Sequence, residues 1–354
     1  MSLPEFWFLL IAVLFTGYFV LEGFDFGVGM LMPIVGRGSE TRKRVVLNTI
    51  GPVWDGNEVW VITAGGALFA AFPEWYASLF SGFYLALLLI LVALIVRIAG
   101  IEYRSKIDDP RWRRTCDVAI GFGSWVPALA WGLAFANMVH GVKLNAHKQI
   151  VGNLLDLLGP YALLGALTTT LLFALHGATF IALKTGGEVR DTARRIGRAV
   201  IVPTAVVVAA FGIWTQLAHG KGWTWIVLAL AVIGLVLAGA SEFRGRDGWA
   251  FTGTALTIVA AVVLLFGSLF PYVLPSSIDP AFGLSVDGRM VGGHLTVAAS
   301  STHYTLMVMS WCAVIVTPVV LLYQGWTYWV FRKRLTVEQI PPAIGLPLRQ
   351  SSVG

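Results

Sequence analysis

The segment Phe6–Pro33, FWFLLIAVLFTGYFVLEGFDFGVGMLMP, decides the fold class of this chain. It exceeds the roughly 20 apolar residues that a helix needs to cross a membrane, although it includes Glu22 and Asp25. The whole sequence agrees, because 57% of its residues are hydrophobic and only 12% are charged, against roughly 25% charged residues in soluble domains. We therefore predict an all-α integral membrane protein.

Hydropathy predicts nine transmembrane helices, at Phe6–Pro33, Pro52–Phe72, Trp75–Ala99, Asp117–Val139, Tyr161–Leu183, Ala199–Ala218, Trp223–Ala240, Trp249–Tyr272 and Tyr304–Phe331. With these spans, 21 of the 25 Lys and Arg residues fall on one side of the membrane. Cytoplasmic loops carry the excess of Lys and Arg, so the N-terminus is expected outside and the C-terminus inside. The net charge of +6 therefore indicates topology, and no nucleic-acid partner is expected.

A short internal similarity suggests how the helices are grouped. Residues 21–26, LEGFDF, resemble residues 175–180, LHGATF. This similarity predicts two related four-helix units running in the same direction, 1–140 with the acidic residues and 161–272. Outer loops 141–160 and 273–303, a ninth helix 304–331 and a cytoplasmic tail 332–354 complete the chain. The Pro-rich end of that tail is expected to be extended. The alternative is chance similarity between two apolar helices.

Four acids stand near the expected cytoplasmic ends of the first two spans. Glu22 and Asp25 are three residues apart, as are Asp55 and Glu58, so each pair shares one helix face. A short connection makes the two helices antiparallel neighbours, which predicts that the four carboxylates meet at one depth. A carboxylate in a helix centre costs roughly 2.5–3.5 kcal/mol, so such groups face a protein interior or wet cavity and often relay protons. Alternatively, the two Glu side chains simply reach the cytoplasmic interface.

Several neighbours of these acids are candidates for a supporting role. Trp54 directly precedes Asp55 and Asn57 follows it two residues later, and both are expected to support the acidic cluster. Arg97 is expected to extend to the cytoplasmic surface, with pairing to the acids as the alternative. Glycines on the first two spans predict close helix packing: Gly23, Gly27, Gly29, Gly65 and Gly66.

Histidine is scarce inside the spans. His176 alone lies well within one, and a lone membrane histidine is more often a packed, hydrogen-bonded residue than a ligand. Cys116 and Cys312 are isolated thiols. No metal site and no haem ligand are therefore expected in this chain.

Sequence motifs along nearly the whole chain resemble subunit II of the cytochrome bd-type quinol oxidases. The resemblance is carried by GFDFGVGML (23–31), GPVWDGNEVWVITAGGALFAAFP (51–73), FSGFY (80–84), EYRSKIDDPRW (102–112), GSWVPALAWGLAFAN (123–137), LFPYVLPSS (269–277) and LLYQGWTYWVF (321–331).

The resemblance implies a heterodimer with subunit I in the bacterial cytoplasmic (inner) membrane, with small accessory subunits as further partners. Subunit I would carry the b-type and d-type haems, and the complex would oxidise quinol and reduce dioxygen to water with protons taken from the cytoplasm. This chain would not be catalytic alone, and it would contact membrane lipid and a structural quinone at a site that the resemblance does not locate. The family's proton path corresponds to Asp25 and Asp55 here, whereas Glu22 and Glu58 stand at less uniform positions.

Two other functions fit the residues. Buried acids and an internal repeat also occur in proton- or cation-coupled secondary transporters, although no pair of broken helices stands at matching positions in the two halves. A purely structural membrane subunit, whose acids form only interface hydrogen bonds, is the third reading.

Overall fold

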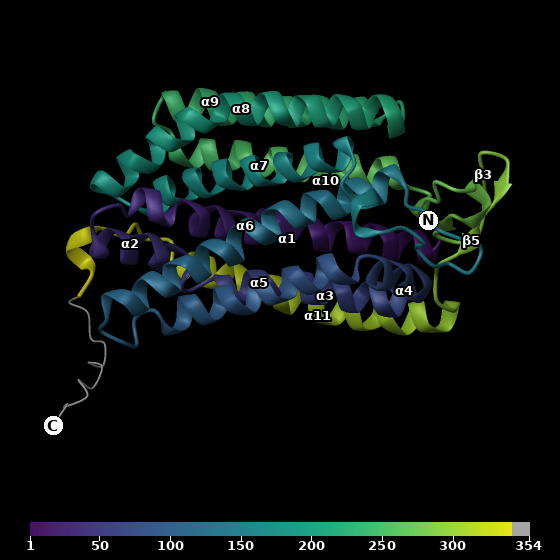
Figure 1. The fold of residues 1–354 in the computed structure, drawn as a ribbon, viewed down its shortest axis with the longest axis horizontal. Helices are drawn as coiled ribbons and strands as arrows, with labels where there is room; N and C mark the ends of the chain where they lie inside the picture. The colour runs from purple at the N-terminus through teal and green to yellow at the C-terminus, as the bar shows by residue number, and fades with distance from the viewer. Residues whose placement is uncertain (342–354) are drawn as a thin grey trace.

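The computed structural model describes residues 1–341 and shows a mostly helical bundle (Figure 1). The helices are α1 (Leu3–Val35), α2 (Glu40–Ile50), α3 (Trp54–Ala71), α4 (Pro73–Gly82), α5 (Tyr84–Tyr103), α6 (Pro110–His140), α7 (Pro160–Lys184), α8 (Gly187–His219), α9 (Thr224–Phe243), α10 (Asp247–Leu269) and α11 (His303–Val330), with 3-10 turns η1 (Leu154–Leu157), η2 (Pro280–Phe282) and η3 (Val337–Gln339). The Pro-rich end of the tail lies outside the described residues, apart from its first residue, Pro341.

Eight described helices are long and apolar enough to cross a membrane: α1, α5, α6, α7, α8, α9, α10 and α11. Helix α3 has 18 residues but carries Asp55 and Glu58, which make it less apolar. The third predicted span, 75–99, is divided between α4 and α5, so the long helix begins only at Tyr84. Helix α2 lies in the connection between the first two predicted spans and was not predicted.

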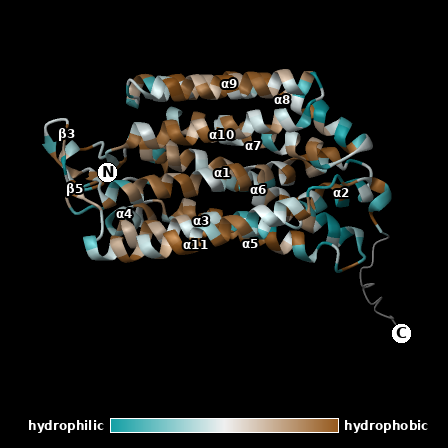
Figure 2. Cartoon of the chain, turned by 180° about the vertical axis from the view of Figure 1, so that it is seen from behind, coloured by the Kyte–Doolittle hydropathy of each residue, from teal (hydrophilic) through white to brown (hydrophobic). Residues whose placement is uncertain are grey.

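The two ends of the bundle differ in character. The N-terminus and five short strands lie at one end, the strand end, whereas α2 and the last described residues lie at the other, the α2 end (Figure 1). Hydrophobic residues predominate along the middle of the long helices and hydrophilic ones at both ends (Figure 2). This distribution is the one that a bilayer core imposes on a helical bundle.

Helix directions follow from the contacts of α1. Asn57 of α3 bonds to the Leu21 carbonyl while Gly17 packs against Trp60, so α1 and α3 are antiparallel. Gly23 packs on Phe173 and Gly27 on Gly177, so α1 and α7 are parallel. The two segments with similar sequences therefore contact one another, and the rings of Phe24 and Phe180 stack 3.9 Å apart.

Glycines allow this close approach of α1 and α7. A methyl group at Gly27 would lie 2.1 Å from the Phe173 carbonyl oxygen and 2.7 Å from the Gly177 Cα atom. Gly65 and Gly66 of α3 differ, because a methyl group there would meet nothing within 4 Å in the described chain. The prediction of close packing therefore holds for Gly23, Gly27 and Gly29 on α1, but the structure does not support it for α3 within this chain.

The predicted outer loops fold together at the strand end. Val142 donates from its backbone to the Pro275 carbonyl (3.1 Å), and Ser277 donates back to the Val142 carbonyl (2.8 Å). The second loop contains β1 (Tyr272–Leu274), β2 (Leu284–Ser285), β3 (Met290–Val291), β4 (His294–Leu295) and β5 (Val297–Ala298). Strand β2 pairs antiparallel with β1 and parallel with β5, and β3 pairs antiparallel with β4.

Candidate functional site: a buried carboxylate cluster on α1

Glu22 and Asp25 are completely buried on α1, which lies at the centre of the bundle. Asp25 lies ten residues, about 15 Å of helix, before the end of α1. The Arg97 guanidinium of α5 is also completely buried and donates to the Glu22 carboxylate. Its Cζ atom lies 4.9 Å from the centre of the Phe26 ring. An ion pair therefore sits inside the apolar bundle, where Arg97 offsets the charge of one of the two acids.

Asp25 is held by a second set of polar groups, from α3 and α11. The Asn57 side-chain amide donates to Asp25 Oδ2 at 2.7 Å and, less closely, to the Leu21 carbonyl at 3.4 Å. The Tyr328 hydroxyl donates to Asn57 Oδ1 at 2.6 Å. A continuous chain of hydrogen bonds thus runs from Tyr328 through Asn57 to Asp25. We call Glu22, Asp25, Asn57, Arg97 and Tyr328 the carboxylate cluster.

Four buried polar atoms of the cluster have no hydrogen-bonding partner among the described residues. They are Glu22 Oε2, Asp25 Oδ1, Arg97 Nε and Arg97 Nη2. Each unsatisfied buried polar atom costs about 1–3 kcal/mol, and more when the group is charged. Four unsatisfied atoms in one cluster are unusual for a purely structural ion pair. A buried ion pair is stabilising only if further hydrogen bonds satisfy its remaining lone pairs and protons. Chemically, the cluster offers carboxylate oxygens that are free to take up a proton or a further donor.

The other predicted acids are placed differently. Glu58 is half-buried, and the charge of Arg97 acts on it as well as on Glu22. Asp55 is exposed on α3 and makes no hydrogen bond within the described residues. Trp54 is half-buried beside it and has no bond to the cluster. The structure therefore brings together Glu22 and Asp25, with the Asn57 amide bonded to Asp25, and leaves Asp55 and Trp54 at the edge.

Arg97 does not extend to the surface, so that expectation was wrong and the alternative, pairing with the acids, is what the structure shows. Tyr328 and Gln324 of α11 also belong to the site and were not predicted from the sequence. Gln324 accepts from the Trp60 indole (2.8 Å) and donates to the Gly56 carbonyl (3.2 Å), which ties α11 to α3. Gln324 and Tyr328 stand four residues apart in the last apolar span and therefore share one helix face. This spacing of two polar side chains could have indicated a polar contact of that face.

His176 is a packed, hydrogen-bonded residue. Its Nδ1 lies 2.7 Å from the Thr254 hydroxyl and its Nε2 lies 3.0 Å from the Val20 carbonyl oxygen. Its ring stacks on Phe251 with 4.6 Å between ring centres. Because both ring nitrogens are already bonded, this side chain does not fit the role of an axial haem ligand.

Comparison with known proteins identifies the family. The model of the family described as cytochrome bd terminal oxidase subunit II matches residues 3–331. The chain belongs to this family. It is thus a component of a terminal oxidase, an oxidoreductase complex, and the resemblance seen in its motifs is confirmed.

Similar proteins cover almost the entire chain. Cytochrome bd ubiquinol oxidase subunit 2 of Bacillus subtilis is 40% identical, over 96% of this chain and 98% of that protein. Cytochrome bd-I ubiquinol oxidase subunit 2 of Escherichia coli K12 is 36% identical, over 94% of this chain and 95% of that protein. A chain of the bd oxidase from Geobacillus thermodenitrificans has the same fold, with a TM-score of 0.72 at 16% identity, covering 93% of this chain and 97% of that one.

Proposed function

We propose that this chain pairs with a haem-bearing subunit I in a complex that oxidises quinol and reduces dioxygen to water. In this proposal subunit I ligates the haems, and this chain supports it and conducts protons from the cytoplasm through Asp25 and Asp55. The names of the relatives, which are ubiquinol oxidase subunits, support the quinol reaction.

The proposed topology has nine transmembrane helices, with α3 as the second. It is organised as the units 1–140 and 161–272 followed by α11, in the bacterial cytoplasmic membrane. The parallel packing of α1 and α7 supports it, because α7 runs in the direction of α1 only if an odd number of helices crosses the membrane between them. Basic residues gather at the α2 end, for example Arg104 with Asp117 and three arginines around Asp247. By the positive-inside rule the α2 end then faces the cytoplasm.

The observation that carries the proton path is the pair of unpartnered carboxylate oxygens beside a hydrogen-bonded chain. Asp25 Oδ1 and Glu22 Oε2 are buried and unbonded, while Asp25 Oδ2 is linked through Asn57 to Tyr328. Ionisable groups are costly at this depth and are retained mainly where they serve proton or ion transfer. Asp25 can accept a proton on its free oxygen without breaking the bond that holds it in place.

Asp55 fits the path as the contact with subunit I. It begins a stripe of exposed residues along α3, continued by Val59 (44% exposed) and Ile62 (69% exposed) at helical spacing. Asn57 donates hydrogen bonds to the Leu21 carbonyl and to Asp25, so it lies at their depth in the membrane. Asp55 is only two residues before Asn57 on α3 and therefore lies at about the same depth. A carboxylate that faces lipid near the helix centre costs roughly 2.5–3.5 kcal/mol. The stripe is therefore better suited to a protein partner than to lipid.

The test uses the complex purified through a tag on this chain. In the variants Asp25→Asn and Asp55→Asn, we expect quinol-driven oxygen consumption to fall by about 100-fold, the lower limit for a positioned proton-transfer group. Reduced-minus-oxidised spectra should still show the b- and d-type haem bands, because the amide keeps the shape of the carboxylate. Tyr328→Phe, which removes one hydroxyl, should reduce the rate less.

Asp191→Asn is the matched control, because Asp191 is an exposed acid on α8 with no ion pair in the described chain. Full oxygen consumption with normal spectra in both aspartate variants would exclude the proton path and leave a structural role. Loss of the haem bands together with activity would show a role in assembly. A preparation of wild-type complex without haem would contradict the pairing with subunit I.

A further inference from the structure

A pocket of about 540 Å³ opens at the α2 end, between α1, α2, α7, α10 and the segment that follows α11. Its volume lies within the range of about 300–1,000 Å³ that is typical of ligand pockets. Tyr328, at one side of this pocket, is also a member of the carboxylate cluster. None of the remaining pocket residues has a part in the proposed proton path.

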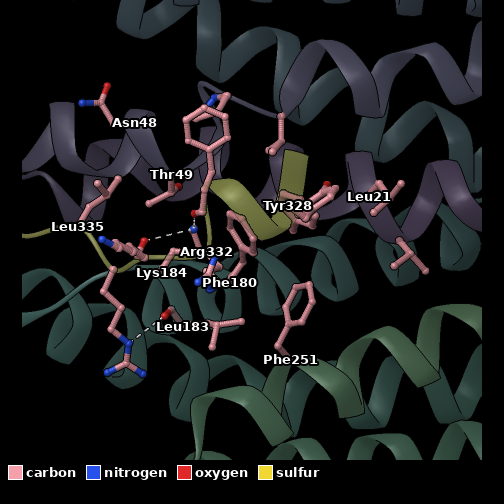
Figure 3. A pocket seen from close by; sticks show the side chains of 17 residues that line it. Leu21, Asn48, Thr49, Phe180, Leu183, Lys184, Phe251, Tyr328, Arg332 and Leu335 are labelled. Carbon is pink, nitrogen blue, oxygen red and sulfur yellow. Dashed lines mark hydrogen bonds between the residues drawn. The ribbon is translucent and has the colours of Figure 1, made fainter. Parts of the chain in front are cut away.

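The interior of the pocket is apolar. Phe24, Phe180 and Phe251 line it together with aliphatic residues such as Leu183. Figure 3 shows Phe180, Phe251 and Tyr328 gathered toward one side, and Lys184 and Leu335 toward the other. The aromatic part can accept hydrocarbon, since it offers little to a hydrogen-bonding ligand.

The lining is also strongly basic. Lys184, Arg332, Lys333 and Arg334 all belong to it, and no Asp or Glu stands among the described lining residues. Arg334 is partly neutralised by Asp247, at 3.1 Å. Lys184 donates only to the carbonyl oxygens of Phe331 and Lys333. Within residues 1–341, neither Arg332 nor Lys333 is in an ion pair, so at least two positive charges at the pocket are not offset by a carboxylate.

We propose that this pocket binds an anionic phospholipid of the inner leaflet, with its phosphate on Arg332, Lys333 and Lys184 and an acyl chain between Phe180 and Phe251. Basic pockets between membrane helices on the cytoplasmic side are suited to such headgroups. A soluble anion would not need the aromatic interior, and a neutral quinone would leave the cations without a counter-charge. A zwitterionic headgroup brings its own cation and is therefore the weaker ligand.

The test measures lipid bound to the intact, purified complex by native mass spectrometry during titration with phosphatidylglycerol or phosphatidylethanolamine. We expect one tightly held phosphatidylglycerol and weaker binding of phosphatidylethanolamine. Each basic residue near an anionic lipid contributes about fivefold in affinity. The double variant Arg332→Gln/Lys333→Gln should therefore bind phosphatidylglycerol about 25-fold more weakly.

The matched control is Arg195→Gln/Arg244→Gln, which removes two exposed charges away from the pocket and should bind as the wild type does. Leu183→Trp tests the apolar part, because the larger ring would fill the space of the acyl chain and should lower lipid occupancy. Leu167→Trp, on an exposed position of α7 outside the pocket, is its control.

Three results would overturn the proposal. Equal affinity for the two lipids would remove the role of charge. Displacement of phosphatidylglycerol by inorganic phosphate alone would indicate a free-anion site. A quinone that is lost in Leu183→Trp but retained in the double glutamine variant would assign the pocket to a neutral ligand.

Discussion

Replacing Arg97 by Gln removes the positive partner of the completely buried Glu22 carboxylate. Glu22 Oε2 already has no hydrogen-bonding partner, and the variant removes the arginine that donates to Oε1. Neither carboxylate oxygen then has a partner among the described residues. Removing one member of a buried ion pair costs about 3–5 kcal/mol, because a buried charge remains uncompensated. Arg97→Gln should therefore lower the free energy of unfolding of the chain in the complex by about 3–5 kcal/mol at pH 7.

The double variant Glu22→Gln/Arg97→Gln separates loss of the pair from loss of packing. It removes both charges, so we expect it to recover a large part of the deficit, with a coupling energy of up to about 3 kcal/mol between the two positions. The free energies come from titration of the purified complex with sodium dodecyl sulfate, followed by far-ultraviolet circular dichroism. Arg244→Gln, at an exposed arginine, should change the value by less than about 0.5 kcal/mol.

Two results would refute this reasoning. If Arg97→Gln is as stable as the wild type, the pair contributes no net stability and the Glu22 charge is accommodated without it. If the double variant is as unstable as Arg97→Gln, the loss reflects the shape of the arginine side chain, including its packing on Phe26, and charge has no part in it.

The close contact of α1 with α7 predicts that Gly27→Ala and Gly177→Ala each destabilise the complex by about 1–3 kcal/mol in the same titration, as overpacking does. Gly121→Ala, where the added methyl group meets nothing within 4 Å, should instead be neutral or stabilising, and equal losses at all three sites would contradict the packing argument. At the strand end, the hydrogen bond from Arg289 lowers the pKa of Asp287, so this contact stabilises the loop above the unfolded pKa of about 3.9 and loses its effect as pH falls further. Arg289→Gln should therefore speed hydrogen exchange of residues 287–298 at pH 7, after correction for intrinsic rates. A difference that does not shrink as the pH is lowered stepwise from about 3.9 to about 1 would exclude the ion pair as its cause.

The acids of α1 illustrate what the sequence could predict. Charged residues three apart within a long apolar segment require an interior position, and Glu22 and Asp25 are indeed buried. The bonded, packed state of His176 was also expected, because a lone membrane histidine seldom has another role. Both conclusions rest on the cost of polar groups in lipid, which depends on composition and depth but hardly on the details of the fold.

Arg97 and Asp55 show where such reasoning ends. Arg97 lies near the end of an apolar segment, where a surface position and a buried pair are equally consistent with hydropathy. Which one occurs depends on the rotation of α5 about its axis, and that rotation is set by contacts such as that of Gly123 with the Arg97 backbone. Asp55 and Asn57 raise the same question for α3. They are two residues apart, so they point about 200° apart around the helix axis. Only the fold decides that Asn57 faces the interior and Asp55 the outside.

The two partners of the ion pair between α1 and α5 are synthesised at different times. Glu22 and Arg97 are 75 residues apart in the chain, so at about 5–20 residues per second a ribosome needs roughly 4–15 s to add the arginine after the glutamate. During that interval Glu22 in the first helix lacks its positively charged partner. The Glu22 charge on the first helix is therefore offset only after the helix that contains Arg97 has followed it into the membrane.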